Sequence, residues 1–227
     1  MIYVVGIIGA MDKEIEFIKN TMVIERTDYY GGRTFYVGKI KGREIVLVQA
    51  GIGKVNAAIT TSLLLQQFSI NYIINTGCAG GLKPAKQCDL IIAKGCTYHD
   101  AQCFDYAYGQ IPDMPHIYMP SQELSSKVEY LAKKNNISYQ KGIIATGDTF
   151  VTSMDTLKEV SKEVNNIIAC DMEATAIAQT CYVYGKPFVI IRMISDVINS
   201  DEQLKSYAEI VVGVCKRAAE FVLKIIE

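Results

Sequence analysis

Three acidic side chains stand where an α/β enzyme could carry its chemistry. Glu14, Glu173 and Asp196 each lie at or just past the end of a run of apolar residues. In an open α/β sheet, ligands bind in the crevice beyond the carboxyl ends of the strands, so acids placed there are the first candidates for chemistry. Each acid taken alone is more typical of a carboxylate at a helix N-terminus, where the helix dipole and the free N–H groups stabilise it.

Together the three acids indicate a more specific chemistry. Three carboxylates without a set of metal-binding histidines favour acid/base work on a neutral or cationic substrate over phosphate binding. Glycoside cleavage needs one acid that protonates the leaving group, one base that activates water, and negative charge near the oxocarbenium-like sugar. The three residues therefore predict this kind of reaction, provided that the fold brings them to one place.

The composition is that of an ordinary globular protein. Of the 227 residues, 50% are hydrophobic, 21% charged and 9% aromatic, which are usual values for a folded domain. Lysine and arginine number 23 against 24 aspartate and glutamate, which leaves a formal net charge of −1. A chain without a basic excess has no electrostatic attraction for nucleic acid or an anionic membrane, so we expect neither as a partner.

The cysteines and histidines give no sign of a metal site or a disulfide framework. The chain has seven cysteines, none in a Cys-x-x-Cys pair, and two histidines, His99 and His116. A zinc site would need a set of such ligands at suitable spacing, so we expect no metal ligands and no cofactor. Free cysteines are usual in a reducing compartment.

The expected location follows from the same cysteines and from the apolar segments. The N-terminus lacks the basic region of a signal peptide, and no apolar run reaches membrane-spanning length. We therefore expect a cytoplasmic protein.

The elements that must position the acids alternate between strands and helices. Short β-branched apolar runs predict strands, and apolar residues recurring every three or four positions predict helices. Strands are expected at residues 2–9, 34–40, 44–50, 72–75, 90–93, 142–146 and 188–194, and helices at 12–22, 55–66, 122–134, 159–164, 174–184 and 207–225. This alternation predicts an α/β fold, a three-layer α/β/α single domain over residues 1–227 with a central mixed β-sheet.

Three segments interrupt the alternation. Residues 98–120 hold four tyrosines, three prolines and both histidines, and such a turn-rich excursion inside a compact domain is typical of a binding loop or an interface segment. Residues 51–54 lack the full phosphate-loop spacing, so a tight strand-to-helix turn is expected there. Residues 75–81 carry three glycines just after a predicted strand, which is typical either of a turn or of a place where a flat ligand approaches the backbone.

Eight segments of the chain match the motifs of one enzyme family. They are residues 6–11 with Glu14, 51–55, 75–77 with 79–81, 98–101, 108–110, 147–148 with Phe150, 172–178, and Arg192 with 194–196. Together they resemble the 5'-methylthioadenosine/S-adenosylhomocysteine nucleosidases of the nucleoside phosphorylase superfamily, over nearly the whole chain. The Met-Glu-Ala-Thr-Ala segment at 172 and the Ile-Ser-Asp segment at 194 are the most specific in this order and spacing.

The resemblance implies a role for each acid. Asp196 would protonate N7 of adenine, with Ser195 and Arg192 holding it in place. Because a free aspartate has a pKa of about 3.9, this role requires surroundings that keep the proton near neutral pH. Glu14 would hold and deprotonate the attacking water on the opposite face of the ribose, and Glu173 would accept hydrogen bonds from the ribose hydroxyls and stabilise the cationic sugar.

The resemblance also implies the residues that shape the pocket around the substrate. Met172 would pack beneath the ribose ring, Phe150 would stack on adenine, and the backbone of Val151 would read the edge of the base. An apolar slot for the 5'-alkylthio group would be lined by Met11, Ile52 and Tyr207. For the methionines and aromatic residues, plain core packing is the alternative.

The chain departs from the family pattern in three places. Cys78 occupies a substrate-binding position where relatives usually carry serine; since a thiol is a poorer donor, we expect tuning rather than loss of activity. Asp171 stands where glutamate is common. The loop 102–108 is about two residues shorter than in relatives. The shape of the pocket around the 5' group therefore stays open, and so does the alignment that places Tyr207 in it.

The resemblance implies the hydrolysis of 5'-methylthioadenosine and S-adenosylhomocysteine to adenine and a 5-substituted ribose. This reaction would belong to methionine salvage and would need no cofactor. The resemblance also implies a homodimer in which residues 98–120 of one subunit complete the pocket of the other. 5'-Deoxyadenosine and a futalosine-type nucleoside are further candidate substrates. Two other functions stay open. A phosphate-dependent nucleoside phosphorylase would need arginines or lysines for the dianion where Glu14 stands, and a non-catalytic nucleoside-binding or storage protein would not need all three acids.

Overall fold

The elements alternate along the chain much as the sequence predicts. The computed structural model describes residues 3–199 and 203–227, with only the backbone of residues 204–206. The elements are β1 (Val4–Gly9), α1 (Asp12–Thr21), β2 (Val23–Tyr30), β3 (Arg33–Ile40), β4 (Arg43–Gln49), α2 (Lys54–Gln67), β5 (Tyr72–Gly81), β6 (Leu90–Tyr98), α3 (Gln122–Lys134), β7 (Tyr139–Thr146), the 3-10 helix η1 (Met154–Leu157), α4 (Val160–Glu163), β8 (Ile167–Asp171), α5 (Ala174–Val183), β9 (Phe188–Val197) and α6 (Gln203–Ile226). Ile2, which the prediction places in the first strand, lies outside the described residues.

The strands form one mixed sheet in the order β2-β3-β4-β1-β5-β8-β7-β6-β9. β1 pairs in parallel with β4 and with β5, which is the arrangement expected of an α/β fold. β5 pairs with β8 and also with β9, so β5, β8, β7, β6 and β9 close into a ring. The mixed sheet confirms the prediction, whereas nothing in the sequence pattern indicated the ring.

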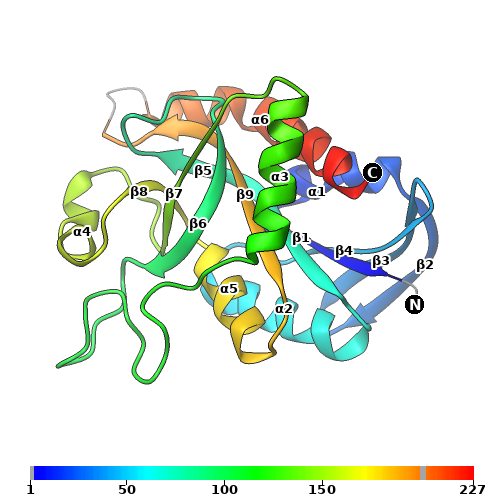
Figure 1. Cartoon of the computed structure of the whole chain (residues 1–227), viewed down its shortest axis with the longest axis horizontal. Coiled ribbons are helices and arrows are strands. Elements are labelled where there is room, and N and C mark those ends of the chain that lie inside the picture. The colour runs from blue at the N-terminus through cyan, green and yellow to red at the C-terminus, as the bar shows by residue number, and fades with distance from the viewer. Residues whose placement is uncertain (1–2, 200–202) are drawn as a thin grey trace.

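Helices cover both faces of the sheet and confirm the three-layer arrangement (Figure 1). α1, α3 and α6 pack against one face in a core that contains Ile7 of β1, and α2 and α5 pack against the other face in a core that contains the neighbouring Ile8. Successive side chains of a strand point to opposite faces. β1 is therefore apolar along its whole length because both of its faces are buried against helices.

Three strands extend at their carboxyl ends beyond the residues that the sequence pattern predicts. β5, β6 and β9 continue to Gly81, Tyr98 and Val197, so residues 75–81 belong to a strand and do not form a turn, which was one of the two alternatives for this segment. Glycine is needed in β5 where it lies close to β9, because a Cβ on Gly81 would lie 2.8 Å from Cγ2 of Ile194. The extension places Asp196 inside β9 and not beyond its end.

The edge strand β2 was not predicted. Six of the eight residues in Val23–Tyr30 are exposed, and the segment lacks the apolar alternation that marks a half-buried strand. It pairs in antiparallel fashion with β3, whose own hairpin with β4 matches the prediction. Hydrogen bonding along the sheet edge, not burial, defines this strand.

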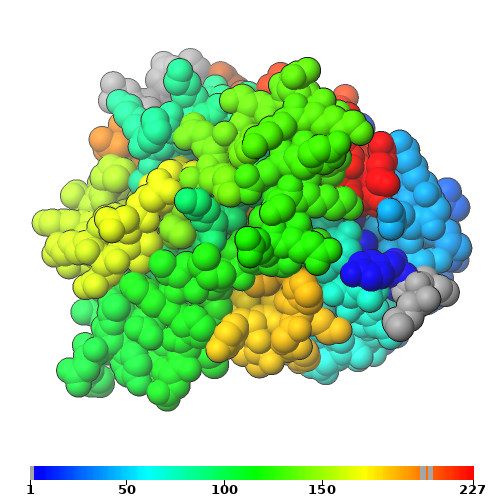
Figure 2. Space-filling view, in the orientation of Figure 1, coloured from blue at the N-terminus to red at the C-terminus, as the bar shows by residue number. Residues whose placement is uncertain are grey.

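Residues 99–121 form the long excursion that the sequence predicts. They contain no helix or strand, and an isolated bridge between Cys96 and Tyr118 fastens the returning chain to β6. Figure 2 shows the excursion as a lobe beside the surface of α5. Within the described residues, no helix is both long enough and apolar enough to cross a membrane.

Candidate active site

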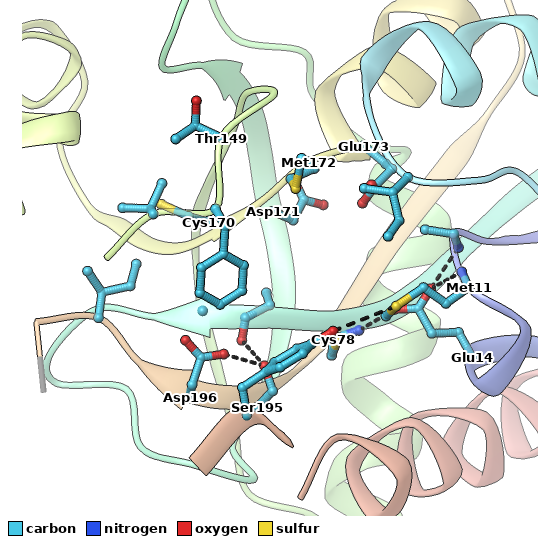
Figure 3. Close-up of a pocket in the computed structure, with 18 residues that line it drawn as sticks. Met11, Glu14, Cys78, Thr149, Cys170, Asp171, Met172, Glu173, Ser195 and Asp196 are labelled. Carbon is cyan, nitrogen blue, oxygen red and sulfur yellow. Dashed lines mark hydrogen bonds between the residues drawn. The ribbon is translucent and has the colours of Figure 1, made fainter. Parts of the chain in front are cut away.

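One pocket of about 640 Å³, its open mouth included, brings the three acids together (Figure 3). Glu14, Glu173 and Asp196 come from α1, the N-terminus of α5 and β9, and all three line it. The remaining lining residues are Ala10, Met11, Ile52, Cys78, Ala79, Gly80, Thr149, Phe150, Val151, Cys170, Asp171, Met172, Ser195, Ile198 and Tyr207. None of the described residues that line the pocket is Lys, Arg or His, so the charged side chains among them are all acidic.

Glu14 is held by three main-chain N–H groups. Its Oε2 accepts hydrogen bonds from the N–H groups of Ala10 at 2.7 Å and Met11 at 3.0 Å, and its Oε1 accepts one from Cys78 at 2.9 Å. The carboxylate can approach β5 because residue 77 is glycine; a Cβ on Gly77 would lie 2.5 Å from Oε1. Glu14 is thus both a helix N-terminal carboxylate and a buried acid with a fixed orientation toward the pocket.

Asp196 is held by side chains. Its Oδ1 lies 2.6 Å from Oγ of Ser195, whose hydroxyl also lies 3.2 Å from the carbonyl oxygen of Ala79. Its Oδ2 accepts a hydrogen bond of 2.7 Å from Nε2 of Gln203. The predicted contact between Ser195 and Asp196 is confirmed.

Glu173 is the N-cap of α5, and its Oε1 accepts a hydrogen bond of 2.8 Å from the N–H of Gly53. Burial, with a contribution from the negative charge of Asp171, raises the pKa of Glu173 to about 8. The Gly53 donor comes from the tight turn between β4 and α2, which the sequence predicts at residues 51–54. Glu173 therefore lies where a carboxylate holds its proton more readily than it does in water.

Arg192 does not hold Asp196, and that part of the prediction is wrong. Its Nε and Nη2 donate to Oδ2 of Asp171 at 3.1 and 2.6 Å, and Nη2 also donates to Asn75 at 2.7 Å. The guanidinium is instead taken up by Asp171 of β8, by Asn75 of β5 and by the carbonyl oxygen of Ile191. Arg192 is buried behind the pocket lining, where Asp171 neutralises its charge.

The predicted apolar and aromatic residues surround the acids. Met11, Ile52, Cys78, Phe150, Val151, Met172 and Tyr207 all line the pocket. The rings of Phe150 and Tyr207 meet edge to face with centroids 5.5 Å apart, and the hydroxyl of Tyr207 donates to Sδ of Met11 at 3.7 Å. Burial raises the pKa of the Tyr207 phenol, which keeps it protonated. This half of the pocket suits a flat apolar ligand.

Sequence reasoning missed several residues of the site. Gln203 is the most important of them, because its side chain contacts Asp196 directly. Nothing in the sequence pattern singles out a glutamine ahead of the amphipathic run of α6. Asp171 was noted in the sequence only as a departure from the family. Its carboxylate accepts hydrogen bonds from Arg192, from the hydroxyl of Thr146 at 2.6 Å and from the N–H of Ala174 at 3.0 Å.

One group of side chains at the pocket has the atoms of a metal site. Oxygen of Glu14 and the sulfurs of Cys78 and Cys215 lie within 4.8 Å of one another. A metal would need thiolate ligands, but the neighbouring Cys215 thiol, burial and the charge of Glu14 raise the pKa of Cys78. Both oxygens of Glu14 are also already hydrogen-bonded. The donor set therefore does not fit a resident metal.

Comparison with known proteins identifies the family of the chain. A family model described as the phosphorylase superfamily matches residues 4–227. A 5'-methylthioadenosine/S-adenosylhomocysteine nucleosidase of Staphylococcus aureus (strain JH9) is 41% identical over 203 residues, covering 88% of this chain and 89% of that protein.

Solved structures agree with this assignment. The same kind of nucleosidase from Neisseria meningitidis, in complex with methylthio-immucillin-A, superposes with a TM-score of 0.93 at 35% identity over 98% of each chain. Futalosine hydrolase of Helicobacter pylori also superposes with a TM-score of 0.93, at 28% identity over 100% of this chain and 98% of that one. The protein therefore belongs to the phosphorylase superfamily and, within it, to the 5'-methylthioadenosine/S-adenosylhomocysteine nucleosidases.

Proposed function

We propose that the protein hydrolyses the N-glycosidic bond of 5'-methylthioadenosine and S-adenosylhomocysteine, releasing adenine and a 5-substituted ribose. The observation that carries this proposal is the convergence of Glu14, Glu173 and Asp196 on one pocket whose described lining has no cationic side chain. Such a pocket favours a water nucleophile and a cationic sugar over a phosphate dianion. The hydrolase assignment also agrees with the names of the relatives.

In the proposed reaction Asp196 is the general acid. It donates its proton to N7 of the adenine ring as the glycosidic bond breaks, which turns the base into a neutral leaving group. Ser195 fixes the carboxyl group from the side of Oδ1. Because Asp196 is 1% exposed, bulk water competes little for the proton.

Glu14 is the proposed base. It orients a water molecule against the anomeric carbon and takes its proton, and its three main-chain donors hold the carboxylate in one direction. Fixing the reacting groups in this way contributes to the rate by proximity and orientation. The donor from residue 78 is a backbone N–H, so cysteine in place of serine leaves that contact intact.

Glu173 is the proposed partner of the ribose. It accepts hydrogen bonds from the ribose hydroxyls, and positive charge that develops on the sugar favours its ionised form. Met172 packs beneath the sugar, Phe150 stacks on the base, and the carbonyl of Val151 accepts from the amino group of the base. Met11, Ile52 and Tyr207 line the slot for the 5'-alkylthio group.

The substrate is tested by measuring base release from a panel of nucleosides. Methylthioadenosine, S-adenosylhomocysteine and 5'-deoxyadenosine should release adenine, and inosine should release no base, since its oxo group would face the carbonyl of Val151. Release from inosine alone, or from none of them over hours, would refute the proposal. A futalosine-type nucleoside belongs in the same panel, because the likeness to futalosine hydrolase makes it the second candidate substrate.

We further propose that the whole chain acts as one domain of a cytoplasmic homodimer in methionine salvage. α2 and α5 contribute large exposed apolar side chains to one surface, with Val55 at 69%, Ile59 at 47% and Val183 at 60% exposure. Contiguous apolar surface of this kind is typical of an interface. Sedimentation should give twice the chain mass of 25.2 kDa, and Ile59→Lys should give the monomer; a monomeric wild type would contradict the dimer.

A further inference from the structure

The side chain of Gln203 occupies the acid end of the pocket. Gln203 is the first residue of α6 and is 5% exposed. Its Nε2 donates one hydrogen to Oδ2 of Asp196 at 2.7 Å and the other to the carbonyl oxygen of Val151 at 2.8 Å. Both hydrogens of the amide nitrogen are therefore used, one on the carboxyl group that the proposed function places beside N7 of the base and one on the carbonyl oxygen that it pairs with the amino group.

A carboxamide nitrogen and the exocyclic amino group of adenine present the same chemistry. Each is a planar nitrogen with two N–H bonds, and each can bridge two acceptors that lie on either side of it. Two hydrogen bonds shorter than 3 Å from one nitrogen fix where that nitrogen must stand. An amino group that uses the same two acceptors must stand in the same place.

We infer that Gln203 is a specificity-determining residue whose amide takes the place of the amino group of the base in the free enzyme and leaves as the base enters. This inference rests on the proposed function. Gln203 keeps Asp196 and the Val151 carbonyl hydrogen-bonded while the pocket is empty, which avoids leaving two buried acceptors unpaired. The base takes over both bonds, so Gln203 competes with it.

Competition of this kind changes affinity and not chemistry. When only part of the enzyme has an open site, the apparent dissociation constant is the intrinsic one divided by the open fraction. Once the base is bound, Gln203 no longer contacts Asp196 and has no part in the bond-breaking step. Removing its amide should therefore lower KM and leave kcat unchanged.

The test compares wild type with Gln203→Ala and with Gln203→Met, which keeps the bulk of the side chain but has no N–H donor. We expect both variants to bind adenine about 3- to 10-fold more tightly by calorimetry, the factor that one net hydrogen bond is worth. KM for methylthioadenosine should fall by the same factor with kcat within twofold. Val212→Ala, at an exposed position of α6, is the control and should match wild type.

Other outcomes distinguish a failure of the role inferred for Gln203 from a failure of the proposed function. Unchanged or weaker adenine binding in both variants, or a fall in kcat, would overturn the inference and assign Gln203 a role in holding Asp196 for catalysis. If wild type itself neither bound nor released adenine, the proposed function would fail as well. If Gln203→Ala does not fold, Gln203→Met alone decides between these results.

Discussion

The two carboxylates that act on opposite sides of the glycosidic bond in the proposed reaction are held by different kinds of partner. Glu14 accepts hydrogen bonds from three main-chain N–H groups, whereas Asp196 is held by the side chains of Ser195 and Gln203. Main-chain donors are independent of residue type and survive substitution of the residues that supply them. The position of Glu14 should therefore depend mostly on the backbone around it, and that of Asp196 on its neighbouring side chains.

Asp196→Asn removes the only proton that the proposed mechanism gives to the leaving base. We expect kcat to fall by about 10² to 10⁴-fold, the usual contribution of general acid catalysis, because the amide cannot protonate N7. Binding of a substrate analogue, measured by calorimetry, should stay within about tenfold. Glu220→Gln, an acid-to-amide change at an exposed position of α6, is the control and should keep full activity; a turnover near wild type in Asp196→Asn would contradict the assigned role.

Gly77→Ala tests whether the position of Glu14 matters. The new Cβ would lie 2.5 Å from Oε1 of Glu14, so the carboxylate must move away from β5. Because misplacement of a catalytic group by about 1 Å can cost 10²-fold in rate, we expect kcat to fall at least about tenfold.

Gly213→Ala is the control for this substitution. A Cβ at position 213 of α6 has no atom within 4 Å, so activity should not change. Circular dichroism melting of both variants distinguishes a displaced carboxylate from an unfolded chain. A folded Gly77→Ala enzyme with normal kcat would show that the contact between Gly77 and Glu14 is not needed.

At this scale the sequence was sufficient for residue types but not for contacts. Glu14, Glu173 and Asp196 could be placed in one pocket because each stands at or near the end of an apolar run, where α/β sheets bind ligands. The partner of Arg192 could not be predicted, because it depends on how β8 lies relative to β9. Gln203 was missed for the same reason: its contacts come from the packing of the start of α6.

At the scale of elements, a buried ion pair connects β8, β9 and the start of α5. Arg192 and Asp171 each have 2% of their side-chain surface exposed, and Nη2 lies 2.6 Å from Oδ2. Asp171 also accepts from the hydroxyl of Thr146 in β7 and from the N–H of Ala174, the first residue of α5. The pair thus fixes the N-terminus of α5, where Glu173 stands, relative to the ring of strands.

Arg192→Leu should strongly destabilise the protein. The substitution leaves Asp171 as a buried charge without its cation, and breaking one side of such a pair costs about 3 to 5 kcal/mol of the free energy of unfolding. Urea denaturation measures the loss. Lys162→Ala breaks the exposed pair with Glu159 and should change stability by less than about 1 kcal/mol; equal effects of the two substitutions would contradict this account.

Strand ends were the least predictable feature of the elements. The apolar runs of β5, β6 and β9 stop at residues 75, 93 and 194, yet pairing continues to Gly81, Tyr98 and Val197. Closure of the ring supplies partners for these polar and glycine residues, and apolar periodicity does not record such pairing. The helix α3 was predicted residue for residue, because its amphipathic pattern spans its full length.

At the scale of the whole molecule, the raised pKa of Glu173 makes stability depend on pH. Its pKa is about 8 in the folded protein and about 4.3 in an unfolded chain, so the folded state holds the proton more tightly. The stabilisation from this proton is fully present below the unfolded value and is lost as pH rises to about 8. Burial lowers the pKa of His99, which acts in the opposite direction but only below about pH 6.5.

The free energy of unfolding should therefore fall between pH 6.5 and 8, by at most about 1.4 kcal/mol per pH unit for one proton. Chemical denaturation at several pH values measures the slope. Glu173→Gln carries no titrating group and should flatten the curve in this range. A wild-type stability that rises toward pH 8, or a variant with the same slope as wild type, would contradict the assignment.

The central claim is that water, activated by Glu14 in a pocket whose described lining has no cationic side chain, cleaves the bond between adenine and ribose. The most direct measurement follows adenine release from methylthioadenosine in phosphate-free buffer and again with added phosphate, while the sugar product is identified by mass spectrometry. We predict the same rate in both buffers and a free 5-methylthioribose product. A rate that requires phosphate, or a ribose 1-phosphate product, would contradict the account.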